Sequence, residues 1–430
     1  MRRTAIGWIL TANVVLAGCG AGAADAPLAR AAVDTVAGIE RWLYPGAGGP
    51  ALEWSIDTVA VIGGAMATDD AYQFDQIDRN GLAVDAAGRL YVLDRAGVRV
   101  LVYDSLGRHG ATYGREGGGP GELGMPLSLA VADDSIWVAD FGNHRYTIYP
   151  RDGGEAREVT LAEELGIPTG RLVVADGSIV QVLRPFGLRR MLRGGAGGPP
   201  PEPPRPILRL STAGEVMDTL WISEPPEMVE AQAGTPSSGR LVMVRTPRQF
   251  EPRLEWEAFS DGGIVVADTT AYVLNLIAAD GTPVRRVARD LPPRETTEAD
   301  KEFARERLRE MQRRGGGIRI AIRQGGGGGS ASAAPPAEEF IKAQLEAMTF
   351  APVIPRITGL RVDALDRIWV GVSLDEPETT ERIDVFDREG RLIGELTGWE
   401  LPDAFLGPSL AARIVRDEDD VQQILIYRIQ

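Results

Sequence analysis

The 430-residue sequence is poor in the side chains that most often bind metals or act as nucleophiles. It has one cysteine, Cys19, so no disulfide can form within the chain. It has two histidines, His109 and His144, too few for a three-histidine zinc site or for most histidine-clustered metal hydrolases. A G-x-S-x-G nucleophile motif is also absent. We therefore expect no catalytic centre built on cysteine or histidine.

Lysine is almost absent as well, since Lys301 and Lys342 are the only ones. The net charge is -15, and arginine forms no long cluster. A nucleic-acid-binding protein presents a positive field over one face. Beyond the N-terminal region, no segment contains the run of about 18 apolar residues that a membrane span requires. We expect neither a nucleic-acid partner nor a membrane-spanning helix.

The N-terminal residues combine Arg2 and Arg3, a weakly apolar stretch at Ala5–Val15, and "LAGC" at Leu16–Cys19. This order resembles the signal peptide of bacterial lipoproteins, whose cysteine is lipidated and becomes the first residue after cleavage. The resemblance implies a signal peptide over 1–18, lipidation of Cys19 and membrane attachment only through lipid. The alternative is an ordinary secretory signal with a chance cysteine.

Residues 19–52 begin with "GAGAADAPLARAA" after the cysteine and are expected to form a tether. Gly20 follows the cysteine, and lipoproteins of this kind usually pass to the outer membrane. The resemblance therefore implies an exported protein, anchored in the cell envelope and facing the periplasm or the surface.

The main feature of the chain is an internal repeat. "GLAVDAAGRLYVLDRAGVRVLVYDSLG", from Gly81, aligns with "SLAVADDSIWVADFGNHRYTIYPRDG", from Ser128, and further copies start at Gly262 and Gly359. In three copies an aspartate precedes a glycine by 13 residues: Asp94 and Gly107, Asp140 and Gly153, Asp268 and Gly281.

Each copy consists of short β-branched and aromatic runs separated by turn sequences such as "DAAG", "SDGG" and "DALD". The predicted unit has four strands, and four-stranded units of about 40 to 50 residues are typical of β-propeller blades. One such sheet cannot cover both of its own faces. Neighbouring blades must therefore supply the cover.

Two weaker copies complete the count. One is interrupted by a Gly/Pro-rich insertion at Gly194–Pro204, and the last, over 410–430, lacks an outer strand. Asp57–Gly64 reads like the missing strand, so we expect Thr58–Ile62 to pair with the last blade and close the ring. The prediction is an all-β, six-bladed propeller over 53–430.

Residues 294–349 interrupt the repeat between blades four and five. "TTEADKEFARERLREMQRRG" and "PPAEEFIKAQLEAM" have helical character, and a Gly-rich stretch lies between them. We expect a helical and Gly-rich insertion there. It would form either an ordered flap over one face or a partly disordered loop.

"VADFGNHRYTIY", Val138–Tyr149, resembles the repeat pattern of NHL-type six-bladed propellers: V-x-D, then N-x-R, then an apolar strand. "GREGGGPGEL", Gly114–Leu123, further resembles a segment of a bacterial family of exported lipoproteins that are six-bladed propellers. The resemblance implies the propeller architecture, but it does not indicate a catalytic activity.

The Gly-rich segment Gly114–Pro126 could suggest a phosphate-binding loop. A P-loop, however, ends in Lys-Ser/Thr and opens a helix, whereas this segment has no lysine and precedes a strand-like run. We expect a connector from the outer strand of one blade to the inner strand of the next.

Connectors of this kind share one rim with the loops that join second and third strands, and that rim is the usual ligand-binding face of a propeller. We take nine polar residues in these loops as candidates for ligand binding: Asp94, Arg95, Arg115, Glu122, Asp140, Asn143, His144, Arg145 and Asp268. The alternative is structural, with each aspartate capping nearby amides and each arginine forming an ion pair or packing between blades.

The sequence therefore favours a binding module for an envelope protein, peptide or glycan, with no cofactor and with no prediction for the oligomeric state. The alternative is a calcium-dependent hydrolase or lyase, lactonase-like, with its site in the central channel. Calcium would need converging Glu, Asn and Asp side chains, and Asn80, Asn143 and Asn275 are the only asparagines after the signal.

Overall fold

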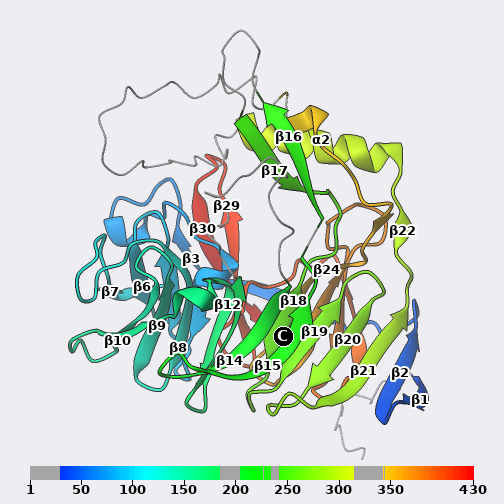
Figure 1. Cartoon of the computed structure of the whole chain (residues 1–430), viewed down its shortest axis with the longest axis horizontal. Helices are drawn as coiled ribbons and strands as arrows, with labels where there is room; N and C mark the ends of the chain where they lie inside the picture. The colour runs from blue at the N-terminus through cyan, green and yellow to red at the C-terminus, as the bar shows by residue number, and fades with distance from the viewer. Residues whose placement is uncertain (1–29, 185–203, 226, 234–241, 314–341, 343) are drawn as a thin grey trace, which may run out of the picture.

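The computed structural model is a six-bladed β-propeller (Figure 1), as the repeat predicts. The structure describes residues 30–184, 204–225, 227–233, 242–313, 342 and 344–430. Within each blade we number the strands from the innermost, next to the channel, to the outermost.

Five blades take four consecutive strands each from one segment of the chain. Blade 1 consists of β4 (Leu82–Val84), β5 (Leu90–Asp94), β6 (Arg99–Tyr103) and β7 (His109–Tyr113). Blade 2 consists of β8 (Pro126–Ala132), β9 (Ser135–Asp140), β10 (Arg145–Pro150) and β11 (Arg157–Thr160). Blade 3 consists of β12 (Ile167–Ala175), β13 (Ser178–Arg184), β14 (Arg205–Ser211) and β15 (Val216–Ser223). Blade 4 consists of β18 (Glu255–Ala258), β19 (Ile264–Asp268), β20 (Val273–Ile277) and β21 (Pro283–Asp290). Blade 5 consists of β24 (Ile357–Val362), β25 (Ile368–Val372), β26 (Arg382–Phe386) and β27 (Leu392–Thr397).

Blade 6 joins the two ends of the propeller segment. Its first three strands are β28 (Ala404–Phe405), β29 (Leu410–Arg416) and β30 (Gln422–Ile429), and its outermost strand is β3 (Ile56–Gly63). β3 pairs antiparallel with β30, with Thr58 opposite Tyr427 and Ile62 opposite Ile424. The predicted closure of the ring is therefore confirmed.

The core is divided among the interfaces between blades. Strands in the middle of a blade are buried along their whole length, as in β5, because both faces of the sheet are covered. A separate buried apolar cluster lies between each pair of neighbouring blades. The prediction that each blade covers its neighbour's faces is confirmed.

Residues 32–63 run along the outer edges of three blades, and we call this segment the N-terminal belt. β1 (Ala32–Val36) and β2 (Ile39–Pro45) form a hairpin, and β2 pairs in parallel with β21 of blade 4. Leu52 donates its amide to the Glu395 carbonyl of blade 5 at 2.9 Å, and β3 follows in blade 6. The segment 19–52 was expected to be a tether, but its described part contains these two strands.

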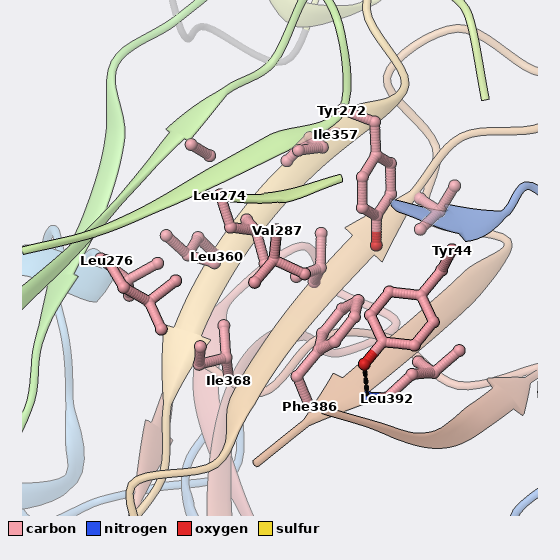
Figure 2. Packing of buried hydrophobic residues seen from close by; sticks show 14 of the residues in the cluster. Tyr44, Tyr272, Leu274, Leu276, Val287, Ile357, Leu360, Ile368, Phe386 and Leu392 are labelled. Atoms are coloured by element: carbon pink, nitrogen blue, oxygen red, sulfur yellow. Dashed lines mark hydrogen bonds between the residues drawn. The ribbon is translucent and has the colours of Figure 1, made fainter. Parts of the chain in front are cut away.

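Tyr44 of β2 shows why the belt stays in place. Its ring is 2% exposed and packs edge-on against Phe386, with ring centroids 6.1 Å apart. The Leu392 amide donates to its hydroxyl at 3.3 Å (Figure 2). The belt therefore completes the apolar core between blades 4 and 5.

A buried polar network lies beside this core. The carboxylate of Asp384 lies 2.9 Å from the Arg289 guanidinium and 2.7 Å from that of Arg382, and it accepts a hydrogen bond from Tyr272. Arg289 also pairs with Glu395 at 2.7 Å. Burial, together with the Asp384 carboxylate, raises the pKa of the Tyr272 hydroxyl well above its ordinary value.

The same two arginines hold the belt. The Arg289 Nε donates to the Pro45 carbonyl at 2.9 Å, and Arg382 donates to the Gly46 carbonyl at 3.2 Å. Glu395 accepts from the Gly49 amide at 3.0 Å. The network thus joins blade 4, blade 5 and the belt.

Because strands alternate in direction, the connections fall on two different rims. The short turns between first and second strands, and between third and fourth, lie on one rim, which we call the short-turn rim. The other, the long-loop rim, carries the connections between second and third strands and between blades.

Two additional structures rise from the long-loop rim (Figure 1). One is the hairpin of β16 (Met228–Ala233) and β17 (Val242–Pro247), between blades 3 and 4. The other, between blades 4 and 5, contains α2 (Glu298–Arg313) and the short pair β22 (Arg294–Glu295) and β23 (Val353–Ile354). Residues 314–341 and 343 of the predicted insertion lie outside the described residues, as do 185–203, which include all of the Gly/Pro-rich insertion except Pro204.

Candidate functional site

Two adjoining hollows lie on the long-loop rim. The smaller, of about 520 Å³, is lined mainly by blade 3 and by the connection that leads into blade 4. The larger, of about 760 Å³, lies between α2 and the rim. Gln249, Phe250 and Arg253 line both hollows. We call the pair the rim groove.

Two lining residues of the smaller hollow form an ion pair between opposite blades. Arg79 precedes the innermost strand of blade 1, and Glu255 begins the innermost strand of blade 4, on the opposite side. The Arg79 Nη2 lies 3.0 Å from the Glu255 carboxylate. This pair therefore spans the centre of the ring at the smaller hollow.

Further charged residues continue down the innermost strands. Arg171 of blade 3 pairs with Glu257 of blade 4 at 2.7 Å, and Arg361 of blade 5 lies 3.6 Å from Asp403 at the start of blade 6. Glu257 is 4% exposed and Arg361 6% exposed. Charges of alternating sign from blades 3, 4, 5 and 6 therefore lie next to one another on this side of the ring.

The pKa values in the channel reflect burial and these pairings. Burial raises the pKa of the Glu257 carboxyl, although Arg171, Arg361 and Arg79 partly oppose the shift. Burial also lowers the pKa of Arg361. Burial acts in the same direction on Arg79, but Glu255 and Glu257 outweigh it, and the net pKa of Arg79 is raised.

Apolar contacts hold α2 on the rim. Ala304 of α2 is buried in one cluster with Phe250, Ala351 and Ile354. The rings of Phe250 and Phe350 lie 5.9 Å apart. Phe303, the residue before Ala304, is 40% exposed and lines the larger hollow. The groove therefore combines an aromatic surface with charged side chains.

The N-terminus of α2 is capped by its own sequence. The Thr297 amide donates to the Asp300 carboxylate at 2.8 Å, and the Asp300 amide donates to the Thr297 hydroxyl at 3.3 Å, which is a capping box. Arg294 donates to both oxygens of the same carboxylate, at 2.6 and 2.8 Å. The Arg294 and Thr297 hydrogen bonds lower the pKa of Asp300 to about 2.

We expect the Asp300→Ala substitution to loosen α2, since it removes the cap and leaves Arg294 without this carboxylate. Amide hydrogen exchange in 298–313 should become faster, whereas Glu298→Ala, at an exposed position, should leave it unchanged. Because the folded pKa is depressed, the contribution of Asp300 is complete above the ordinary value of 3.8 and disappears as the pH falls through about 2. Unchanged exchange in the Asp300 variant would contradict the capping role.

The nine candidate residues from the sequence all lie in or beside connections of the long-loop rim, but none of them lines either hollow. Asp94 is fully buried and accepts hydrogen bonds from the amides of Asp75, Gln76 and Gly97. Asp140, also fully buried, accepts from Gly124 and Met125. Each aspartate thereby fixes the connector that leads into its own blade.

Asn143 and Arg145 make similar structural contacts. Asn143 donates to the Gly117 carbonyl at 2.9 Å, and Arg145 donates to the carbonyls of Gly119 and Glu122 at 2.8 Å each. The residues of the V-x-D and N-x-R pattern therefore hold the Gly-rich connector.

The other candidates are more accessible. Arg95 pairs with Asp78 at 2.7 Å, and Arg115 with Glu122 at 3.0 Å. Asp268 caps the Thr270 amide at 3.1 Å, and His144 is exposed beside Phe141. These contacts match the structural alternative, and ligand binding by the nine residues stays a prediction.

Gly114–Pro126 is a connector, as expected, because it leads from β7 to β8. Gly114 has a φ of +81°, and a Cβ there would lie 2.8 Å from Leu123 and 2.9 Å from the Tyr149 hydroxyl. Glycine is therefore needed for both conformation and space.

The residues of the groove and channel were missed because they lie outside the repeat or occur in only one blade. One usable signal was present in the sequence: charged residues occur next to apolar ones in the innermost strands, as in "EWEA" from Glu255 and "GLRV" from Gly359. In a propeller, such residues point either to the channel or to a neighbouring blade.

In the described part of the chain, no group of three or more His, Cys, Asp or Glu side chains is arranged to hold a metal ion. Likewise, none of the helices described is long and apolar enough to cross a membrane.

No protein-family model matches the chain, and no curated protein matches it. Three similar solved structures are a putative exported protein from Bacteroides fragilis, a protein of unknown function from Bacteroides thetaiotaomicron and virginiamycin B lyase from Staphylococcus aureus.

Their sequence identities are 10%, 13% and 10%, with TM-scores of 0.43, 0.40 and 0.38. The matches cover 88%, 88% and 87% of this chain, and 95%, 76% and 99% of the other chains. Similarity at this level establishes neither an activity nor a ligand for this protein.

Proposed function

We propose that this protein is a lipid-anchored β-propeller of the bacterial cell envelope that binds a protein segment, peptide or glycan in the rim groove. The lipoprotein-like N-terminus supports export and anchoring at Cys19. One structural observation carries the binding role: two hollows lie next to each other on the rim and share Gln249, Phe250 and Arg253 as lining residues, so that together they form an extended site. Such a groove suits a chain-like ligand better than a small enclosed one.

The chemistry of the groove supports the same role. Arg253 is 70% exposed at its side chain and pairs with Glu378 at 2.7 Å, so it is a rim ion pair that a ligand can compete for. Phe303 offers an exposed aromatic face. Aromatic and arginine side chains are the commonest energetic centres of binding surfaces.

We expect the double substitution Arg253→Glu and Phe303→Ser to abolish capture of the specific envelope ligand. The measurement is cross-linking and pull-down from envelope extracts with the purified full chain. The matched control, Arg157→Glu and Leu365→Ser, changes one arginine and one exposed apolar residue, at sites that line neither hollow of the rim groove. A ligand retained by wild type and control but lost by the groove variant supports the proposal. Equal capture by all three proteins would overturn it.

The calcium-dependent hydrolase or lyase is the competing function. It predicts one tightly bound calcium per chain in the channel and turnover of lactones or sugars that a chelator removes. In the structure, Arg79 and Glu255 pair across the centre of the ring, so a substrate that entered from the smaller hollow would meet this ion pair. Calcium analysis and turnover assays on purified protein, with and without chelator, test this function directly.

A further inference from the structure

The β1–β2 hairpin extends blade 4 beyond the edge of the other blades and exposes one patterned face. β1 is the end strand of this six-stranded sheet in the described part of the chain. One face of the extension carries Tyr44, Trp42 and Val287, which pack toward blade 5. We call the opposite face of the hairpin and β21 the extension face.

The pairing register places three rows of side chains on the extension face, because side chains of a strand alternate between its faces. Two rows are apolar and one, between them, is charged. The rows are Ala32, Leu43 and Ala288; then Asp34, Arg41 and Arg286; then Val36, Ile39 and Val284. Leu43, Val36 and Val284 are 47%, 48% and 46% exposed.

We propose that the extension face lies against a phospholipid bilayer and sets the orientation of the propeller at the membrane. This inference rests on the anchoring part of the proposed function. The apolar rows would enter the headgroup region, and the arginines between them would contact phosphate.

The length of the N-terminal chain supports a bilayer as the occupant. Ten residues lie between Cys19 and Arg30, and the eleven Cα–Cα steps from one to the other span at most about 40 Å. If Cys19 carries lipid, β1 is the first described strand after the anchor. Arg30, just before β1, therefore lies within about 40 Å of the membrane surface, which places the extension face within reach of the bilayer.

Charge also favours a bilayer over a second copy of the chain. Near this face Arg30, Arg41 and Arg286 exceed Asp34 and Asp290 by one positive charge, in a protein whose net charge is -15. Arg41 pairs with Asp34 at 3.5 Å, which leaves Arg286 as the arginine of the charged row without a carboxylate in that row. Anionic phospholipids attract such a locally basic face. Two copies joined antiparallel at the centre of β1 would bring Asp34 opposite Asp34, which is unfavourable.

The test uses hydrogen exchange on anchored protein. The chain beginning at Cys19 is coupled through its only thiol to a maleimide phospholipid in vesicles of phosphatidylcholine and phosphatidylglycerol. We expect amide exchange in β1 and β2 to slow by about tenfold relative to the uncoupled chain, with little change in the rim groove. Unchanged exchange in 32–45, or slowing only elsewhere, overturns the proposal.

A matched pair of variants identifies the surface. Val36→Asp with Val284→Asp should remove the slowing while the protein stays coupled. Val216→Asp with Ile222→Asp, on exposed positions of blade 3, should leave the slowing of exchange intact.

A second copy of the chain is the other occupant that the experiment can detect. If exchange in β1 slows without vesicles as protein concentration rises, and sedimentation shows a dimer, the occupant is a second copy and the proposal is wrong. The chemical anchor makes the result independent of natural lipidation and of any ligand in the groove.

Discussion

The Asp384→Ala substitution should lower the free energy of unfolding by about 3–5 kcal/mol, since removal of one member of a buried ionic network strands the others. Asp384 is fully buried between the guanidinium groups of Arg289 and Arg382. Without the carboxylate, the two buried guanidinium groups would have only Glu395 as an anionic partner in the network. Chemical unfolding of the purified protein, followed by tryptophan fluorescence, measures the change.

The control for this prediction is Glu389→Ala, in the turn that follows β26. Glu389 pairs with Arg391 at 3.2 Å, but both side chains are about half exposed. Exposed pairs contribute at most about 1 kcal/mol. Similar losses in the two variants would show that Asp384 is not part of a desolvated network.

The second large effect concerns the closure of the ring. Ile62→Ala should cost about 2–5 kcal/mol, as buried isoleucine-to-alanine changes usually do. Ile62 is fully buried and packs in the cluster between blades 6 and 1, while its strand pairs with β30. The substitution leaves a cavity at the junction between the first and last strands of the propeller.

Val61→Ala is the neighbouring control. Val61 lies on the same strand but is 51% exposed, so its truncation should change stability by no more than about 0.5 kcal/mol. Thermal unfolding of both variants compares them directly. A loss at Val61 equal to that at Ile62 would mean that β3 contributes pairing alone and no core contact.

The propeller could be predicted from the sequence because its turns repeat. Asp85 and Asp363 show the physical basis: each accepts two amides of its turn and pairs with the arginine four residues later. The turn chemistry recurs, and therefore the strands between the turns can be counted. Closure was predictable for the same reason, since the last copy lacked a strand that Asp57–Gly64 could supply.

The belt and the groove could not be predicted in this way. Nothing in "AVDTV" or "IERWLYP" repeats elsewhere, and Tyr44 becomes a core residue only through contact with Phe386, more than 300 positions away. The groove depends on insertions that occur once each. The recurrence of aspartates in the repeat made them candidates for ligand binding, yet Asp94 and Asp140 each hold the connector into their own blade.

The N-terminal belt has a mechanical consequence. Any tension on the chain before Arg30 reaches β1 and β2 first, and β2 lies lengthwise along β21, where its hydrogen bonds share the load. The force would next have to break the hydrogen bonds that hold residues 45–49, which are made by Arg289, Arg382 and Glu395, before it could reach β3. The hairpin therefore protects the pairing between β3 and β30, so that a force on the residues before Arg30 need not open the ring.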